Sequence, residues 1–170
     1  MKRVLILGSS GSGKSTLSRL LGAKLDLPII YLDQHYWLPG WQESTAEQWQ
    51  ETLENLLRRE RWIMDGTFSG SFDKRAAVAD SIVFLDMPRW LCLWRVFKRR
   101  IRFHKQSRPD MTQGCPERIN WGFFEYIWTY RRKRGLLIMD KMKKLQMQKS
   151  VFIIQSKKEL SQFKQQHGIG

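Results

Sequence analysis

The sequence lacks several features that define whole classes of proteins. Only two of its 170 residues are cysteines, Cys92 and Cys115, so we expect neither a disulfide framework nor a paired metal-binding motif. The longest apolar runs, such as residues 4–7 and 136–139, are far shorter than the ~18 residues that cross a bilayer. The apolar run after the basic start is also too short for a signal peptide. We therefore expect a cytoplasmic protein with no membrane partner.

Acidic residues are scarce relative to basic ones. Lys and Arg number 30 against 16 Asp and Glu, which gives a formal net charge of +14. Residues 95–149 hold 16 of these bases and only four acids, together with eight aromatic residues. With 42% hydrophobic and 12% aromatic residues, the chain is too apolar for a disordered protein and has the size of one domain. The basic segment predicts an anionic ligand, either a nucleotide or a nucleic acid.

Five apolar runs of strand length alternate with helical patterns along the chain. They lie at residues 2–8, 29–33, 61–65, 81–86 and 150–155. This alternation predicts a three-layer α/β/α fold with a five-stranded parallel sheet, formed by residues 1–170 as a single domain. The pair Ser44 and Glu47 predicts a capping box at the start of a helix over residues 44–59. Ligands of such sheets bind beyond the carboxyl ends of the strands.

A phosphate-binding loop follows the first strand. Residues 8–15, GSSGSGKS, match the Walker A pattern G-x-x-x-x-G-K-[ST] at every fixed position, and they lie between a strand and a helix as the motif requires. The N–H groups of such a loop and the helix dipole hold a polyphosphate. We expect Lys14 to reach the β- and γ-phosphates of ATP, and the Ser15 hydroxyl to ligate Mg²⁺. The expected ATP-binding residues of the loop are Gly8, Ser9, Ser10, Gly11, Ser12, Gly13, Lys14, Ser15 and Thr16.

Acidic residues end three of the other expected strands. Asp65 ends a short apolar run and precedes Gly66, which favours it as the second Mg²⁺-binding residue. Asp86 is the alternative, but the Pro88 that follows favours a structural place at a strand-to-helix turn. Asp33 has the chemistry to orient the acceptor hydroxyl or to take its proton. The alternative interpretation of Asp33 is an acid in a surface turn.

Two groups of arginines lie in the basic segment. Arg95 and Arg99 share one face of an expected helix, where two guanidinium groups can clamp a nucleotide, one over its base and one on phosphate. We expect a helical lid over about residues 99–135, in which Arg131 or a neighbouring arginine neutralises the transferred phosphoryl group. The alternative interpretation of both groups is a solvated basic surface.

Together these motifs resemble the adenylate-kinase-like branch of the P-loop kinases, over nearly all 170 residues. Within that branch the sequence is most similar to the bacterial proteins labelled DNA topology modulation proteins, a label that names no reaction. The segments that carry the resemblance are residues 8–16, 31–41 (YLDQHYWLPGW), 62–66 (WIMDG), 86–90 (DMPRW) and 95–100 (RVFKRR).

The resemblance implies roles for particular residues. It places the Walker B acid on Asp65, the adenine contact on Arg95 and a phosphate contact on Arg99. It also implies that the turn after the last strand, at Ser156 and Lys157, holds adenine through backbone groups.

One departure from the adenylate kinases concerns the acceptor. In those enzymes the Asp-Gly pair precedes Phe-Pro-Arg, whose arginine holds AMP, whereas here Arg75 is the nearest downstream arginine. Because the loop over residues 36–41 is aromatic, we expect a flatter or less charged acceptor, bound by an insertion over about residues 34–60. The residues expected to bind the acceptor are Asp33, Trp37, Trp41 and Arg75.

Two hypotheses for the function follow. The first is a Mg²⁺- and ATP-dependent kinase of a nucleotide, nucleoside or other small molecule. Its expected catalytic residues are Lys14, Asp33, Arg99 and Arg131. The second is a nucleotide-binding protein with a nucleic-acid-binding, DNA-topology or regulatory role, which the clustered charge and interleaved aromatic residues favour. We favour the kinase because a lid over polyphosphates also requires arginines, and because the sequence shows no separate nucleic-acid motif.

Overall fold

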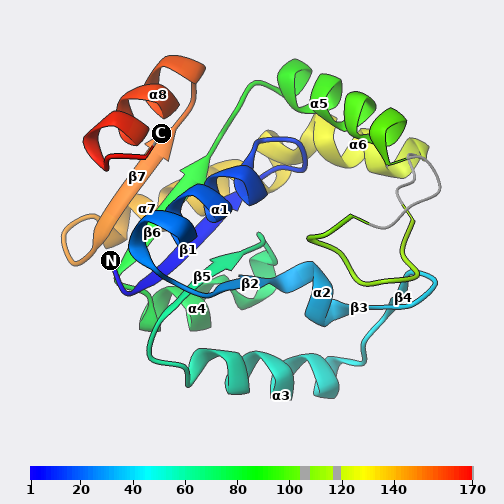
Figure 1. The fold of residues 1–170 in the computed structure, drawn as a ribbon, viewed down its shortest axis with the longest axis horizontal. Coiled ribbons are helices and arrows are strands. Elements are labelled where there is room, and N and C mark those ends of the chain that lie inside the picture. The colour runs from blue at the N-terminus through cyan, green and yellow to red at the C-terminus, as the bar shows by residue number, and fades with distance from the viewer. Residues whose placement is uncertain (104–107, 117–119, 170) are drawn as a thin grey trace.

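The computed structural model describes residues 1–103, 108–116 and 120–169. At its centre lies a five-stranded sheet in the order β2-β5-β1-β6-β7, in which every neighbouring pair is parallel (Figure 1). The strands are β1 (Arg3–Gly8), β2 (Ile29–Tyr31), β5 (Trp62–Asp65), β6 (Ser81–Leu85) and β7 (Ser150–Ile154). The predicted α/β fold with a five-stranded parallel sheet is thereby confirmed.

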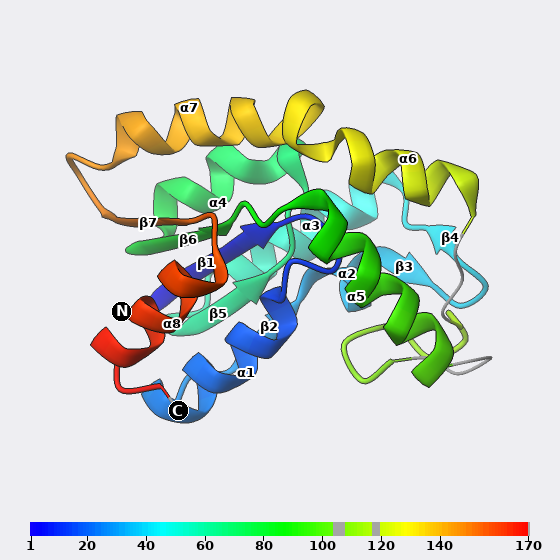
Figure 2. The same ribbon diagram turned by 90° about the horizontal axis from the view of Figure 1, so that it is seen from above.

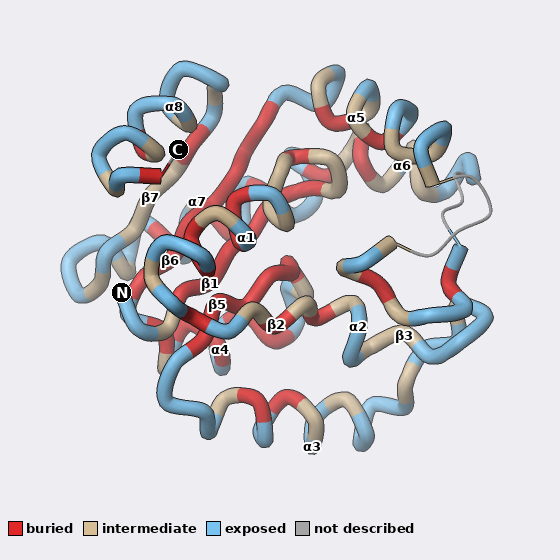
Figure 3. The backbone as a smooth tube through the Cα atoms, viewed as in Figure 1, coloured by how far each residue is buried: buried red, intermediate tan, exposed pale blue. Residues whose placement is uncertain are grey.

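Helices cover both faces of this sheet (Figure 2). Those on one face are α1 (Lys14–Leu25), α5 (Arg89–Arg102) and α8 (Lys157–Gln166), and those on the other are α3 (Ala46–Leu57), α4 (Phe72–Val78) and α7 (Leu136–Leu145). Successive side chains of a strand point to opposite faces, so Val4 and Ile6 pack with the first group of helices and Leu5 and Leu7 with the second. The buried residues therefore follow the strands in Figure 3.

The expected insertion over residues 34–60 contains elements that the sequence did not indicate. The short helix α2 (Leu32–Tyr36) begins directly after β2, so Asp33 lies on a helix and not at the end of a strand. An antiparallel hairpin follows, formed by β3 (Trp37–Leu38) and β4 (Gln42–Glu43). Strands of two residues leave too short an apolar alternation to be seen in a sequence.

The capping box of α3 lies one residue later than predicted. Thr45 accepts a hydrogen bond from the N–H of Gln48 at 3.2 Å, and Gln48 Oε1 accepts one from the N–H of Thr45 at 3.1 Å. Ser44, the predicted cap, instead donates to the backbone carbonyl of Tyr36 at 2.8 Å. Either residue has the chemistry of an N-cap, and the contact with α2 decides between them.

The expected lid over residues 99–135 lies only partly in the described ranges, because residues 104–107 and 117–119 fall outside them. Its last part is a helix, α6 (Trp121–Tyr130), which a π-helical turn, η2 (Arg131–Gly135), joins directly to α7. Buried Tyr130 and Ile138 anchor this long helix on the sheet. None of the helices in the described ranges is long and apolar enough to cross a membrane.

Candidate functional site

The Walker A loop joins β1 to α1 at the carboxyl edge of the sheet. Three of its glycines have positive φ angles, +146° at Gly8, +79° at Gly11 and +106° at Gly13. A Cβ at Gly8 would lie 2.6 Å from the carbonyl oxygen of Leu85, and one at Gly11 would meet the backbone of Cys92. Since Gly13 at the N-cap has no side chain, the first N–H groups of α1 are left for an anion.

Lys14 and Ser15 begin α1 on the floor of the site. Lys14 Nζ donates to the carbonyl oxygen of Ser9 at 3.0 Å, so its side chain curls back over the loop. Ser15 Oγ donates to the carboxylate of Asp110 at 2.7 Å. The charge of Lys14 also acts on the carboxyl groups of Asp33 and Asp65. The structure thus brings the predicted loop residues and both predicted acids to one place.

Asp65 ends β5 as a buried carboxylate whose Oδ2 has no hydrogen-bond partner among the described residues. Burial raises the pKa of this carboxyl to about 6, and Asp33 and Asp110 add to the rise, while Lys14 and the nearby Ser15 hydroxyl oppose it. Mg²⁺ commonly takes one or two such oxygens together with phosphate oxygens and waters, so Ser15 and Asp65 fit this ion. In the described ranges no three His, Cys, Asp or Glu side chains could hold a metal by themselves.

Asp110 is a site residue that the sequence did not reveal. Its carboxylate accepts from Ser15 and lies 3.1 Å from the Nη1 atom of Arg108. Burial alone would raise the pKa of Asp110, but Arg108, Ser15 and Arg99 help to hold it below its usual value. The residue is 95 positions away from Ser15, in a segment with no motif, so only the folded chain shows this contact.

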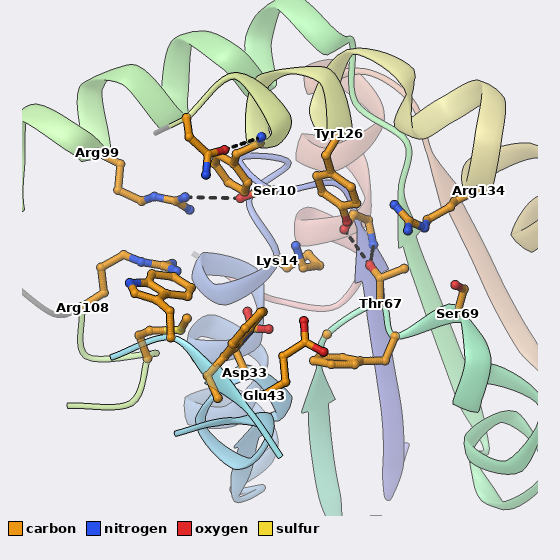
Figure 4. A pocket seen from close by; sticks show the side chains of 18 residues that line it. Ser10, Lys14, Asp33, Glu43, Thr67, Ser69, Arg99, Arg108, Tyr126 and Arg134 are labelled. Atoms are coloured by element: carbon orange, nitrogen blue, oxygen red, sulfur yellow. Dashed lines mark hydrogen bonds between the residues drawn. The ribbon is translucent and has the colours of Figure 1, made fainter. Parts of the chain in front are cut away.

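Two arginines of α5 reach the Walker A loop. Arg95 Nη1 donates to the carbonyl oxygens of Ser12 at 2.8 Å and Gly11 at 3.3 Å. Arg99 Nη2 donates to Ser10 Oγ at 3.2 Å (Figure 4). Their spacing of four residues turns both side chains toward the loop.

A cavity of about 700 Å³ opens beside Lys14 (Figure 4). Arg99 and Arg108 approach it from one side and Arg134 from the other, while Tyr126 and Thr67 lie near Arg134. Its lining residues are Gly8, Ser10, Lys14, Asp33, Trp37, Trp41, Glu43, Gly66, Thr67, Phe68, Ser69, Arg99, Arg108, Met111, Asn120, Phe123, Tyr126 and Arg134. The cavity therefore joins the Walker A loop to a large aromatic and ionic compartment.

Asp33 lines this cavity from α2. Burial raises the pKa of its carboxyl, while Lys14 and Arg108 act in the opposite direction. A carboxylate with a raised pKa in a cleft is a candidate general base. Asp33 lies in the same cavity lining as Lys14.

The β3–β4 hairpin gives the cavity an aromatic wall. The rings of Trp37 and Trp41 lie 5.4 Å apart, and Tyr36 packs edge-on against Trp37 at 5.1 Å. The Tyr36 hydroxyl donates to the carboxylate of Glu43 at 2.8 Å, and the indole of Trp41 donates to the carbonyl oxygen of Pro116 at 3.1 Å. The Trp41 contact ties the hairpin to the segment after α5.

Thr67 connects the loop after β5 to the Walker A loop. Its Oγ1 accepts from the N–H of Gly8 at 3.2 Å and donates to the carbonyl oxygen of Gly8 at 2.8 Å. The Tyr130 hydroxyl lies 3.4 Å from Thr67 Oγ1. Thr67 therefore holds the first glycine of the Walker A loop, and Tyr130 of α6 contacts Thr67 in turn.

Arg75, predicted to bind the acceptor, does not reach the cavity. Its side chain is fully buried on α4, and its guanidinium donates to the carbonyl oxygens of Gly66 at 2.8 Å, Phe68 at 2.9 Å and Thr67. Burial lowers the pKa of this group to about 10. Arg75 instead holds the loop after β5 in shape, which corrects the expectation of an acceptor contact.

Arg131, predicted as a catalytic arginine, also lies away from the cavity. Its Nε atom is 3.1 Å from Asp86 Oδ2, which accepts a further hydrogen bond from Gln155 Nε2 at 2.8 Å. Asp86 thus joins the ends of β6 and β7 to η2. Three residues later in the same turn, Arg134 faces the cavity instead.

Three further predicted ATP-binding residues, Thr16, Ser156 and Lys157, lie outside the cavity lining. Ser156 caps α8 by accepting from the N–H of Glu159 at 3.1 Å, and Lys157 is the first residue of that helix. Thr16 is exposed in the first turn of α1. All three lie at the starts of helices, Thr16 in α1 and the other two at α8.

Comparison with known proteins adds a relative and a fold. No protein-family model matches the chain. The chain is 31% identical over 131 residues to the uncharacterized protein YqaC of Bacillus subtilis, a match that spans 76% of this chain and 72% of that protein. It is also 33% identical over 72 residues to threonine synthase-like 1 of Mus musculus. This second match spans 41% of this chain and 10% of that protein.

Several solved kinase structures have the same fold. Shikimate kinase from Acinetobacter baumannii, in complex with shikimate, superimposes with a TM-score of 0.63 at 13% identity, over 99% of this chain and 94% of that chain. Shikimate kinase from Bacteroides thetaiotaomicron gives 0.58 at 17% identity, over 99% of both chains. A gluconokinase from Sinorhizobium meliloti gives 0.55 at 14% identity, over 98% and 89%. The chain has the fold of the P-loop kinases and belongs to the family of YqaC.

Proposed function

We propose that this protein transfers the γ-phosphoryl group of ATP to a small molecule bound in the cavity. The observation that carries the proposal is the meeting of the Walker A loop and the 700 Å³ cavity at Lys14, with Asp33 in the same wall. A loop that binds phosphate without such a cavity would hydrolyse or only hold a nucleotide. The shared fold with kinases of small molecules supports the same conclusion.

The donor would lie on the Walker A loop. Its β- and γ-phosphates would replace the Ser9 carbonyl as the partner of Lys14. Arg99, which donates to Ser10 of the loop, would contact the same phosphates. Ser15 and Asp65 would hold Mg²⁺, which when bound supplies positive charge to the β- and γ-phosphate oxygens. The adenine contacts of Arg95, and of the turn at Ser156 and Lys157, remain part of this proposal.

The acceptor would lie between the aromatic hairpin and α6. Its hydroxyl oxygen attacks the γ-phosphorus, the bond from that phosphorus to the bridging oxygen breaks, and ADP leaves with the electron pair. Asp33 takes the proton of the attacking hydroxyl. Trp37 and Trp41 would bind the acceptor, and Arg134 takes the role that the sequence interpretation gave to Arg131.

The experiment that tests this function compares ATP-dependent phosphorylation by the wild type, Asp33→Asn and the matched control Asp73→Asn. Asp73 is an exposed acid of α4 with a surface ion pair to Lys141, so its variant should keep full activity. Asp33→Asn should lower transfer to the acceptor by about 100-fold or more, with ATP affinity changed little. Equal transfer by the two variants would remove Asp33 from the mechanism.

The alternative function is that of a nucleotide-binding protein with a nucleic-acid or DNA-topology role. This alternative includes membership of the DNA topology modulation proteins, and the net charge of +14 supports it. Binding of an oligonucleotide through several phosphates should fall by orders of magnitude between about 50 and 200 mM salt. The kinase proposed here, which we place in the cytoplasm, should instead discriminate between small-molecule acceptors.

A further inference from the structure

Helix α5 has three faces with different contacts. One face turns Arg95 and Arg99 to the Walker A loop. A second buries Cys92 and Val96 against the sheet. The third is apolar and exposed, and its large side chains recur at the i, i+4, i+7, i+11 spacing of a single helical stripe. These exposed residues are Trp90 (64% exposed), Trp94 (54%), Phe97 (54%) and Ile101 (64%).

The apolar surface continues onto α6, which lies beside α5 (Figures 1 and 2). A shallow groove of about 450 Å³ between the two helices has no polar residue among its lining residues. Phe124 and Ile127 form its α6 side, and Trp121 next to it is 78% exposed. We refer to Trp90, Trp94, Phe97, Ile101, Trp121 and Phe124 as the aromatic face. Contiguous exposed apolar surface with a polar border is typical of a binding site.

Basic side chains border the aromatic face. Lys98 lies over the ring of Trp94 at 4.8 Å, and Arg89 lies over the ring of Trp128 at 4.0 Å. Arg100 and Arg102 are further bases of α5, and the helix contains no acid. A second copy of this chain would bring the same positive charges together, so like-charge repulsion opposes self-association through this face.

Two anionic partners match an apolar face with a basic border, and the side chains of the face distinguish them. Bases of single-stranded nucleic acid stack on aromatic rings. Here aliphatic side chains make up much of the surface, with Ile101 exposed on α5 and Leu93 and Ile127 lining the groove. The side chains that project outward suit the headgroup boundary of a bilayer, where Trp and flanking Lys and Arg are favoured.

We propose that the aromatic face binds the surface of a membrane that contains anionic lipids. Trp94 and Ile101 enter the boundary between headgroups and acyl chains, while Lys98 and Arg102 remain with the lipid phosphates. The contact lies on the surface of the bilayer and requires no spanning helix. The proposal therefore replaces the expectation of no membrane partner, which rested on the short apolar runs of the sequence. It does not depend on the kinase function, because none of these four residues lines the cavity beside Lys14.

Co-sedimentation with vesicles tests this proposal on the full-length protein. The probes are vesicles of phosphatidylcholine alone and of phosphatidylcholine with an equal amount of phosphatidylglycerol. The double variant Trp94→Ser/Ile101→Ser removes the apolar contact and leaves the Trp90–Trp128 packing in place. Its matched control is Leu137→Ser, which removes an exposed leucine of α7 (64% exposed) and no charge. An oligothymidine of fixed length is titrated against each protein in parallel.

The wild type should bind the anionic vesicles. The affinity of the double variant for them should be lower by about tenfold or more, because two apolar side chains no longer enter the lipid. Leu137→Ser should bind within about twofold of the wild type, since its site lies away from the face. Equal binding by the double variant and the wild type would overturn the proposal. So would a double variant that loses oligothymidine binding and keeps vesicle binding, because the face would then serve nucleic acid.

A measurement on the wild type alone covers the case in which the double variant does not fold. Vesicles that carry brominated phosphatidylglycerol quench tryptophan side chains that enter the acyl region. We expect these vesicles to quench the tryptophan fluorescence more strongly than vesicles with brominated phosphatidylcholine alone. Absence of quenching by either kind would overturn insertion of the aromatic face.

Discussion

Replacing Asp65 by asparagine is expected to stabilise the nucleotide-free protein while weakening its binding of Mg²⁺-ATP. The carboxyl is buried, its Oδ2 has no hydrogen-bond partner in the part of the chain that the structure describes, and burial raises its pKa to about 6. A shift of about two pKa units costs ~3 kcal/mol of folding free energy when the group is ionised. D65N keeps the shape and removes the charge, so its free energy of unfolding should exceed that of the wild type by about 1–3 kcal/mol at neutral pH.

The pH dependence of this effect has a definite sign. The pKa of Asp65 is higher in the folded protein than the ordinary aspartate value of 3.8, so ionisation destabilises the fold as the pH rises from about 4 to about 6. The cost is complete above that range. The difference in unfolding free energy between D65N and the wild type should therefore be large at a pH of about 7.5 and small at about 4.

Urea unfolding at these two pH values is the assay, and Asp80→Asn is the control. Asp80 accepts from the Ser81 hydroxyl and from the backbone N–H groups of Lys2 and Arg3. Burial alone would raise its pKa, but these hydrogen bonds outweigh burial and lower the pKa. Asp80 therefore stabilises the fold above its unfolded pKa, and D80N should be less stable than the wild type at neutral pH. A D65N protein that is also less stable there would refute this reasoning.

Three other predictions concern the site. Lys14→Ala should lower ATP turnover by about 100-fold or more without changing the thermal unfolding midpoint, and turnover near the wild-type rate would contradict the role of Lys14. Asp110→Asn removes the negative charge that lies beside the Ser15 hydroxyl and repels the phosphates of ATP. Calorimetry should therefore show about threefold to tenfold tighter binding of Mg²⁺-free ATP, whereas weaker binding would contradict this repulsion. Arg134→Gln should lower kcat/KM for the acceptor by about tenfold or more, whereas Arg131→Gln should change it by less than about threefold. The reverse order in steady-state kinetics would return the role to Arg131.

The sheet and the Walker A loop could be predicted because their signals are local. Each central strand is a continuous apolar run, since helices cover both faces of a parallel sheet. The loop residues from Gly8 to Ser15 are fixed by a spacing that can be read without knowing the fold. The helical spacing of Arg95 and Arg99 likewise predicted a shared face, and the structure turns that face to the loop.

The acceptor side of the site could not be predicted in the same detail because its contacts join distant residues. Asp110 meets Ser15 across 95 positions, and no pattern in its own segment marks it. Arg75 and Arg131 are ordinary basic residues in the sequence, and only burial on α4 and the position of Asp86 show that both have other partners. Arg134 and Arg131 are three residues apart in the π-helical turn η2. The sequence does not show which of the two side chains faces the cavity, because the π-helical turn is not visible in it.

Transfer of a labelled phosphoryl group tests the central proposal most directly. The wild type and Lys14→Ala are incubated with Mg²⁺ and ATP labelled at the γ-phosphate, together with a bacterial metabolite extract freed of macromolecules. The proposal predicts that the wild type moves label into a new small organic compound and forms an equal amount of ADP, and that Lys14→Ala does not. Label that appears only in inorganic phosphate, or equal transfer by both proteins, would contradict a kinase reaction at this site.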